Sequence, residues 1–122
     1  MYRQGIYRRE EYTLTWSSIA TTATNVAPDT DTEIDCRNAK AIVIQVDLSS
    51  TTYPGDNTDI NVISRAEGAT TYDNVPFAEA NFGSGEVRSF AVTPGPAYIK
   101  LRADNNDTAN KTAPKVVVQI LA

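Results

Sequence analysis

The sequence predicts an all-β protein, an antiparallel β-sandwich of the jelly-roll type with about seven or eight strands and an extended N-terminal arm. Two observations carry this prediction. Apolar side chains recur at every second residue in several separate runs, as a strand buried on one face requires. Clusters of Pro, Gly, Asn and Asp separate these runs, as turns separate short strands. The chain has 122 residues, enough for one hydrophobic core, and we expect a single domain over residues 12–122.

The first strand candidate is the Thr-rich stretch YTLTWSSIATTAT, residues 12–24, which carries Trp16 and Ile19. Further along, Ile34 and Cys36 alternate with charged residues, so we expect both side chains to face the core. Cys36 is the only cysteine, which excludes a disulfide within the chain. We therefore interpret its thiol as a small apolar group of the core.

The clearest alternation lies in KAIVIQVDL, residues 40–48, where every second residue is Ile, Val or Leu. β-Branched and aromatic residues dominate the later runs as well, which suits a pleated surface buried on one side. These runs are TDINVISRAEG (58–68), EVRSFAVT (86–93), AYIKLRAD (97–104) and KVVVQILA (115–122). Residues 75–82, VPFAEANF, are the best candidate for a short helical turn.

Two loops rich in acids and amides attract attention as cation sites. They are PGDNTD, residues 54–59, and DNNDTAN, residues 104–110. Oxygen ligands at this density suit calcium, but neither loop has the spacing of an EF-hand. Asn and Asp are also common turn formers, and we favour that interpretation, with calcium as the alternative. In the first loop, Pro54 and Gly55 predict a type II turn with a positive φ at Gly55.

The composition argues against an enzyme. The chain has no histidine, which removes Ser-His-Asp and Cys-His catalysis and the usual zinc sites. It also lacks a phosphate-binding GxxxxGK[ST] loop, and its acids form no recognisable hydrolytic pair. We expect a non-enzymatic protein with no cofactor and no metal.

Charge and hydropathy restrict the partners. Net charge is −4, and residues 10–122 hold 8 basic and 15 acidic side chains. Such an acidic body repels nucleic acid and anionic membranes, so neither is an expected partner. No apolar run approaches 18 residues, and the N-terminus lacks the apolar core of a signal peptide. We expect the protein to remain where it is made or to leave the cell inside a larger particle.

The first eleven residues, MYRQGIYRREE, predict a docking arm. Residues 1–9 hold three Arg and no acid, and they include apolar and aromatic side chains that a purely solvated tail does not need. Tyr and Arg are enriched at interface hot spots, and nine extended residues span roughly 30 Å, enough to reach a neighbouring subunit. The predicted partner-binding residues are Tyr2, Arg3, Ile6, Tyr7, Arg8 and Arg9. The alternative is a terminus without a role.

The arm, the strand series KAIVIQVDL, TDINVIS and VRSFAVTPGPAYIKLRAD, and the last strand KVVVQILA together resemble small β-sandwich structural and decoration proteins of tailed bacteriophage virions. The resemblance covers roughly residues 40–122. It implies a homo-oligomeric, many-copy component of the virion, made in the host cytoplasm, that coats or cements a capsid or forms part of a tail. The implied partners are other copies of the chain and a capsid or tail protein lattice. The family has no catalytic residues to carry over.

The alternative function is a carbohydrate- or receptor-binding β-sandwich module, with a glycan as the partner. β-Sandwiches often present aromatic platforms for sugar rings. The aromatic residues in or beside the predicted loops are Tyr53, Tyr72, Phe77, Phe82 and Tyr98.

Overall fold

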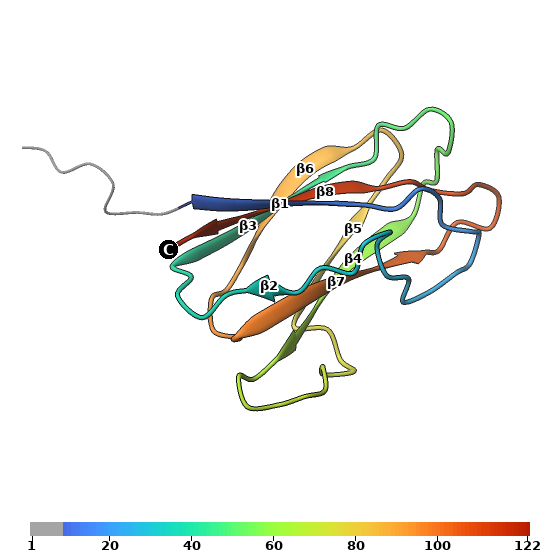
Figure 1. Cartoon of the computed structure of the whole chain (residues 1–122). Helices are drawn as coiled ribbons and strands as arrows, with labels where there is room; N and C mark the ends of the chain where they lie inside the picture. Colours follow the sequence, from blue (N-terminus) through green and yellow to red (C-terminus); the bar gives the residue numbers. More distant parts are fainter. Residues whose placement is uncertain (1–8) are drawn as a thin grey trace, which may run out of the picture.

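The computed structural model describes residues 9–122, and these form eight strands and no helix (Figure 1). The predicted all-β fold class is confirmed. The strands are β1 (Arg9–Thr15), β2 (Ile34–Asp35), β3 (Ala41–Asp47), β4 (Thr58–Arg65), β5 (Ala78–Phe82), β6 (Val87–Val92), β7 (Tyr98–Asn105) and β8 (Lys115–Leu121). No helix within the described residues is long and apolar enough to cross a membrane.

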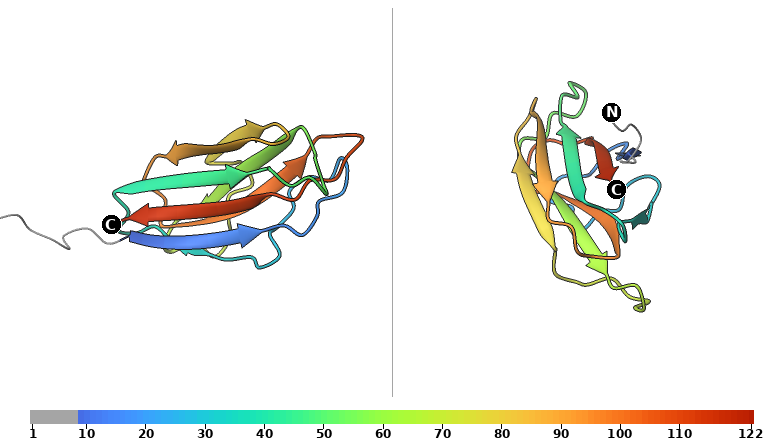
Figure 2. Two further views of the ribbon diagram at one scale, coloured as in Figure 1. Left: turned by 90° about the horizontal axis from the view of Figure 1, so that it is seen from above. Right: turned by 90° about the vertical axis from the view of Figure 1, so that its left-hand side faces the viewer.

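The strands form two four-stranded antiparallel sheets, with the orders β1-β8-β3-β6 and β2-β7-β4-β5. Figure 2 shows the first sheet face-on and the two layers from the end. Consecutive strands mostly alternate between the sheets, which is the strand order of a jelly roll built from two Greek keys. The predicted jelly-roll topology is therefore confirmed.

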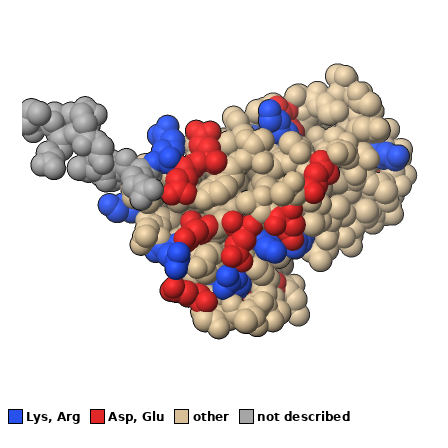
Figure 3. Space-filling model, in the orientation of Figure 1, with Lys and Arg blue, Asp and Glu red and all other residues tan. Residues whose placement is uncertain are grey.

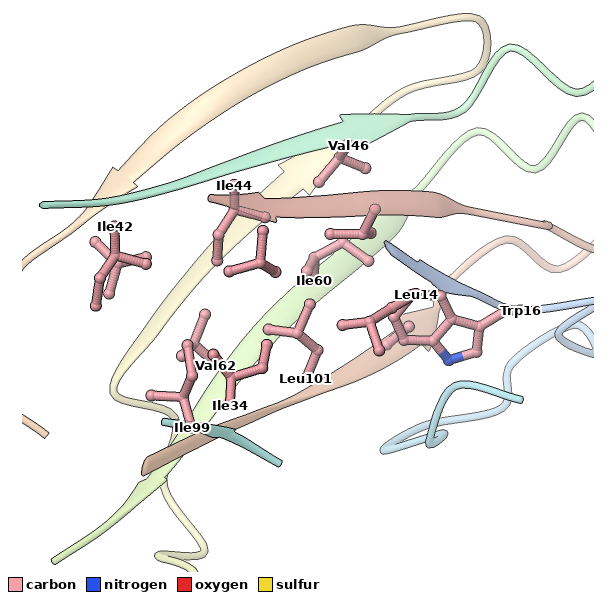
Figure 4. Packing of buried hydrophobic residues seen from close by; sticks show 14 of the residues in the cluster. Leu14, Trp16, Ile34, Ile42, Ile44, Val46, Ile60, Val62, Ile99 and Leu101 are labelled. Carbon is pink, nitrogen blue, oxygen red and sulfur yellow. The ribbon is translucent and has the colours of Figure 1, made fainter. Parts of the chain in front are cut away.

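Side chains from the inner faces of both sheets meet in one core (Figure 4). Ile44 of β3 and Leu101 of β7 are fully buried, as the period-two pattern predicts. Trp16 is also buried, and its indole Nε1–H donates to the backbone oxygen of Val26 at 3.0 Å, so its polar group is satisfied. Cys36 is buried as predicted.

The prediction of one long first strand over residues 12–24 is wrong, because β1 ends at Thr15. Trp16 and Ile19 are both buried, and a spacing of three residues cannot place two side chains on one face of a strand. Asp29 accepts hydrogen bonds from the N–H and hydroxyl of Ser17 at 3.1 and 2.7 Å, which hold the chain in a bend there.

The helical turn predicted within residues 75–82 is also wrong, because Ala78–Phe82 form β5. The strand β4 offers residues 58–62 as an antiparallel partner, and this pairing overrides the local preference. Likewise Gly55 does not adopt a positive φ; a Cβ there would lie 2.7 Å from the Cβ of Thr112, so glycine permits a close approach of two loops.

Candidate functional site

The predicted arm meets the described structure at the first residue of β1. Arg9 is exposed and lies in register with Leu121 of β8, at one corner of the β1-β8-β3-β6 sheet. The other predicted partner-binding residues lie outside the described residues; they are Tyr2, Arg3, Ile6, Tyr7 and Arg8. Three residues of the predicted arm, residues 9–11, belong to β1.

We call the outer face of the β1-β8-β3-β6 sheet the uncharged face, because its centre carries no charged side chain. This centre surrounds a shallow depression of about 130 Å³. The lining residues are Val43, Gln45, Ser89, Val117 and Gln119. Val87 at the start of β6 is 52% exposed and extends the apolar surface to the sheet edge. Sequence alternation identifies these side chains as outward-facing but does not show that they adjoin one another.

Charged residues occupy only the margins of the uncharged face. Glu11 of β1 accepts a hydrogen bond from Nε2 of Gln119 at 3.2 Å. At the opposite end of the strands, Asp47 of β3 is in register with Lys115 of β8. Hydrogen bonds from the hydroxyl and N–H of Ser49 hold the pKa of Asp47 below its ordinary value. This face therefore has a neutral, partly apolar centre with charges at its ends.

The outer face of the β2-β7-β4-β5 sheet carries several ion pairs, and we call it the ion-pair face. In Figure 3 acidic and basic side chains gather over the part of the molecule where β2 and β7 lie. Arg65 forms two hydrogen bonds with Glu33, at 3.0 and 3.1 Å, and Tyr72 donates its hydroxyl to the same carboxylate at 2.6 Å. The Arg65 guanidinium also lies 4.1 Å from the ring centre of Tyr98. The Arg65 cation is therefore held by partners within the chain.

The electrostatics of the ion-pair face follow from these contacts. The hydrogen bonds from Arg65 and then from Tyr72 lower the pKa of Glu33. Burial, followed by the bond to Glu33, raises the pKa of Tyr72. At the end of β2, the side-chain hydrogen bond from Arg37 lowers the pKa of Asp35 to about 2. All three groups therefore keep one charge state near neutral pH, which suits a structural role rather than proton transfer.

In the acid-rich loops, carboxylates accept hydrogen bonds from backbone N–H groups. Asp107 Oδ1 accepts N–H bonds from Ala109 and Asn110 at 2.7 and 3.2 Å, and its Oδ2 accepts the N–H of Asp56 at 2.9 Å. The backbone bond from Ala109 is the main cause of the lowered pKa of Asp107. Within residues 9–122, no group of three or more acidic or cysteine side chains is arranged to hold a metal ion. The turn interpretation of Asp107 is confirmed.

The aromatic residues named as sugar platforms occupy different environments. Phe82 is fully buried and contacts Phe90, with ring centres 6.0 Å apart. The prediction that Phe82 offers a platform for a sugar ring is therefore wrong. Tyr98 stacks under Arg65, whereas Phe77 remains 44% exposed.

A pocket of about 300 Å³ opens on the ion-pair face beside β4. Its lining includes Tyr72, but also Asn61, which is nearly buried although it faces outward from the sheet. Alternation alone predicts an exposed position for Asn61. It misses the burial of this residue because the pocket is formed by a loop and two strands that are distant in the sequence.

No protein-family model matches the chain, and no curated protein is similar to it in sequence. Solved structures of similar chain fold include the SPBc2 prophage-derived protein YomS, at 12% identity and a TM-score of 0.47, covering 97% of this chain and 99% of that one. They also include a Bacillus endospore appendage that forms disulfide-linked pili, at 12% identity and a TM-score of 0.44, covering 93% of this chain and 87% of that one. A third is Desmodium yellow mottle tymovirus, at 5% identity and a TM-score of 0.41, covering 100% of this chain and 90% of that one.

A prophage-derived protein and a virus are thus among the structures of similar chain fold. At these identities and TM-scores the similarities carry no argument about function. The jelly-roll assignment rests on the strand order, and the function has to be argued from the two sheet faces.

Proposed function

We propose that the chain is a non-enzymatic structural component of a phage-like particle, which assembles with other copies and coats or cements a capsid or forms part of a tail. The observation that carries the proposal is the uncharged face, a neutral and partly apolar sheet surface with Val43 and Val117 at its centre. Surfaces of this kind, ringed by polar groups, are typical of protein–protein contacts.

The proposed occupant of the uncharged face is the N-terminal arm of a second copy. Residues 1–8 span roughly 26–29 Å when extended, more than the length of a seven-residue strand. The arm supplies Tyr2, Ile6 and Tyr7 for the neutral centre and arginines for the acids at the margins, such as Glu11 and Asp47. A basic arm and an acidic body also attract each other between identical copies. Association of this type leads from one copy to the next and suits a particle lattice.

The proposal is tested by sedimentation velocity and size-exclusion chromatography of the full-length protein beside a shortened protein beginning at Glu10. We expect the full-length protein to form concentration-dependent oligomers and the shortened protein to run as a monomer. Val117→Lys should shift the full-length protein toward monomer, because it places a charge in the neutral centre, while circular dichroism stays unchanged.

Thr52→Lys is the matched control, since it adds the same charge at an exposed loop position outside the uncharged face. It should assemble as the wild type does. If full-length and shortened proteins run as identical monomers and neither binds isolated particles, the proposed function fails.

A further inference from the structure

Asn61 of β4 is the one buried side chain within the described residues whose polar atom lacks a partner. The residue is 6% exposed. Its Nδ2 donates to Oδ2 of Asp104 at 2.9 Å, whereas its Oδ1 accepts no hydrogen bond. A buried acceptor without a donor is costly, and native proteins rarely retain one without a reason.

The orientation of the Asn61 amide is fixed by its neighbour. A carboxylate only accepts hydrogen bonds, so the NH₂ group must face Asp104. Asp104 is itself held in place, because its Oδ1 accepts the N–H of Asn25 at 2.6 Å. Turning the amide over would set two oxygens against each other. The Oδ1 atom is therefore left without a donor, at a residue that lines the pocket.

The pocket has walls from three separate parts of the chain. The floor comes from β4 and β7, one wall from the segment before β2, and the other from the loop between β4 and β5, which extends below the sheets in Figure 1. Backbone bonds from Asp73 to Ser64 and from Phe77 to Val62, at 2.9 and 2.7 Å, tie that loop to β4. The lining residues are Asn25, Asn61, Ile63, Tyr72, Asp73, Asn74, Pro76 and Arg102.

The lining determines the chemistry of a ligand. The Oδ1 atom of Asn61 requires a hydrogen-bond donor, which excludes a phosphate or carboxylate at that point. Arg102 is paired with Asp31 through two bonds, at 2.8 and 3.1 Å, so its charge is already compensated. Asp73 also lines the pocket, and its negative charge disfavours an anionic ligand there, whereas a hydroxyl group can donate to it.

Hydroxyl groups both donate and accept, as this mixture of amides and charged groups demands, and Ile63 and Pro76 add apolar contact. A volume of about 300 Å³ is at the lower end of the range for ligand pockets and fits a single ring. We propose that this pocket binds one neutral sugar ring of a surface glycan, and that Asn61 Oδ1 accepts a hydrogen bond from a ring hydroxyl.

This binding site goes beyond the proposed structural function and does not depend on it. The pocket lies on the ion-pair face, and the uncharged face lies on the other sheet, so one copy can contact a neighbour and a glycan at once. The failure of the sugar-binding proposal would therefore leave the structural proposal standing, and the reverse also holds.

The test is a two-dimensional amide NMR titration of the full-length protein with methyl glycosides of glucose, galactose and mannose, with N-acetylglucosamine and N-acetylgalactosamine, and with glucuronate as the charged probe. We expect at least one neutral sugar to cause saturable shifts at residues 25, 61 and 72–76. Asn61→Leu should weaken this sugar roughly tenfold or more, because the acceptor is lost.

Two further variants keep the result interpretable if Asn61→Leu folds poorly. Ile63→Trp fills the pocket and should abolish the shifts, whereas Thr52→Trp, which adds the same ring at an exposed loop position outside the pocket, should leave them unchanged. The proposal is overturned if no neutral sugar gives saturable shifts in the pocket, if only glucuronate does, or if the shifts persist in Ile63→Trp.

Discussion

The amide of Asn105 joins two loop segments at one end of the sandwich, and its removal should be among the most costly polar substitutions in the protein. The side chain is fully buried. Its Nδ2 donates to the backbone oxygens of Ile19, Ala20 and Asn110 at 3.2, 3.1 and 3.0 Å, and its Oδ1 accepts the N–H of Asp107 at 3.0 Å. Asn105→Ala removes all four bonds.

The cost depends on which partners keep another hydrogen bond. The oxygens of Ile19 and Ala20 each retain a backbone donor, at 3.2 Å in both cases. The oxygen of Asn110 and the N–H of Asp107 retain none among residues 9–122. Two groups without a partner cost about 1 kcal/mol each at partly exposed positions, and the space left by the side chain adds a similar amount. We expect Asn105→Ala to lower the free energy of unfolding by about 3 kcal/mol.

Urea denaturation followed by the fluorescence of Trp16 measures this loss, and the melting temperature should fall by roughly 10 °C. Asn106→Ala is the control, because Asn106 is exposed and makes one side-chain bond, to Asp59 at 2.9 Å. It should cost less than about 1 kcal/mol. If both variants unfold at the same urea concentration, the reasoning about Asn105 is refuted.

Three further predictions follow from burial and charge. Ile44→Asp places a charge at a fully buried position of β3, and the variant should show no cooperative unfolding transition by circular dichroism; a cooperative transition would contradict the assigned core. Arg8→Ala combined with Arg9→Ala should leave the circular dichroism spectrum unchanged but weaken assembly, with the larger loss at low salt, and unchanged sedimentation at low salt would count against the arm. The pKa of Asp35 is lowered to about 2 by Arg37, so its stabilising contribution is present above its ordinary pKa of 3.8 and disappears as the pH falls toward 2. The melting temperature of Asp35→Asn should therefore lie below that of the wild type at pH 6 and converge with it near pH 2; a constant difference would show that the ion pair is not the cause.

Period-two alternation was sufficient to predict the strands that have a simple inside and outside. In β3 the side chains of Ile42, Ile44 and Val46 are buried, as their spacing indicates. Alternation failed where a residue's position depends on a distant partner. Residues 78–82 form a strand because β4 lies beside them, and Gly55 is needed because Thr112 approaches it.

The surfaces were harder to predict than the core for the same reason. Val43 and Ser89 belong to one depression only because β3 and β6 pair in the folded sheet. Asn61 reads as an exposed polar residue in the sequence, and its burial depends on Arg102 of β7 and on the loop after β4. The arm residues named from composition remain predictions.

The proposed assembly depends on contact between the arm of one copy and the uncharged face of another, and disulfide trapping tests this contact directly. Cys36 is 3% exposed and burial raises its pKa to about 11, so it should not compete with introduced thiols. Ile6→Cys and Val117→Cys are prepared as separate full-length variants and mixed under mild oxidation. We predict a disulfide between the two variants, seen by mass spectrometry as a mixed dimer. No mixed dimer, or a double variant that closes the bridge within a single chain, would contradict the account.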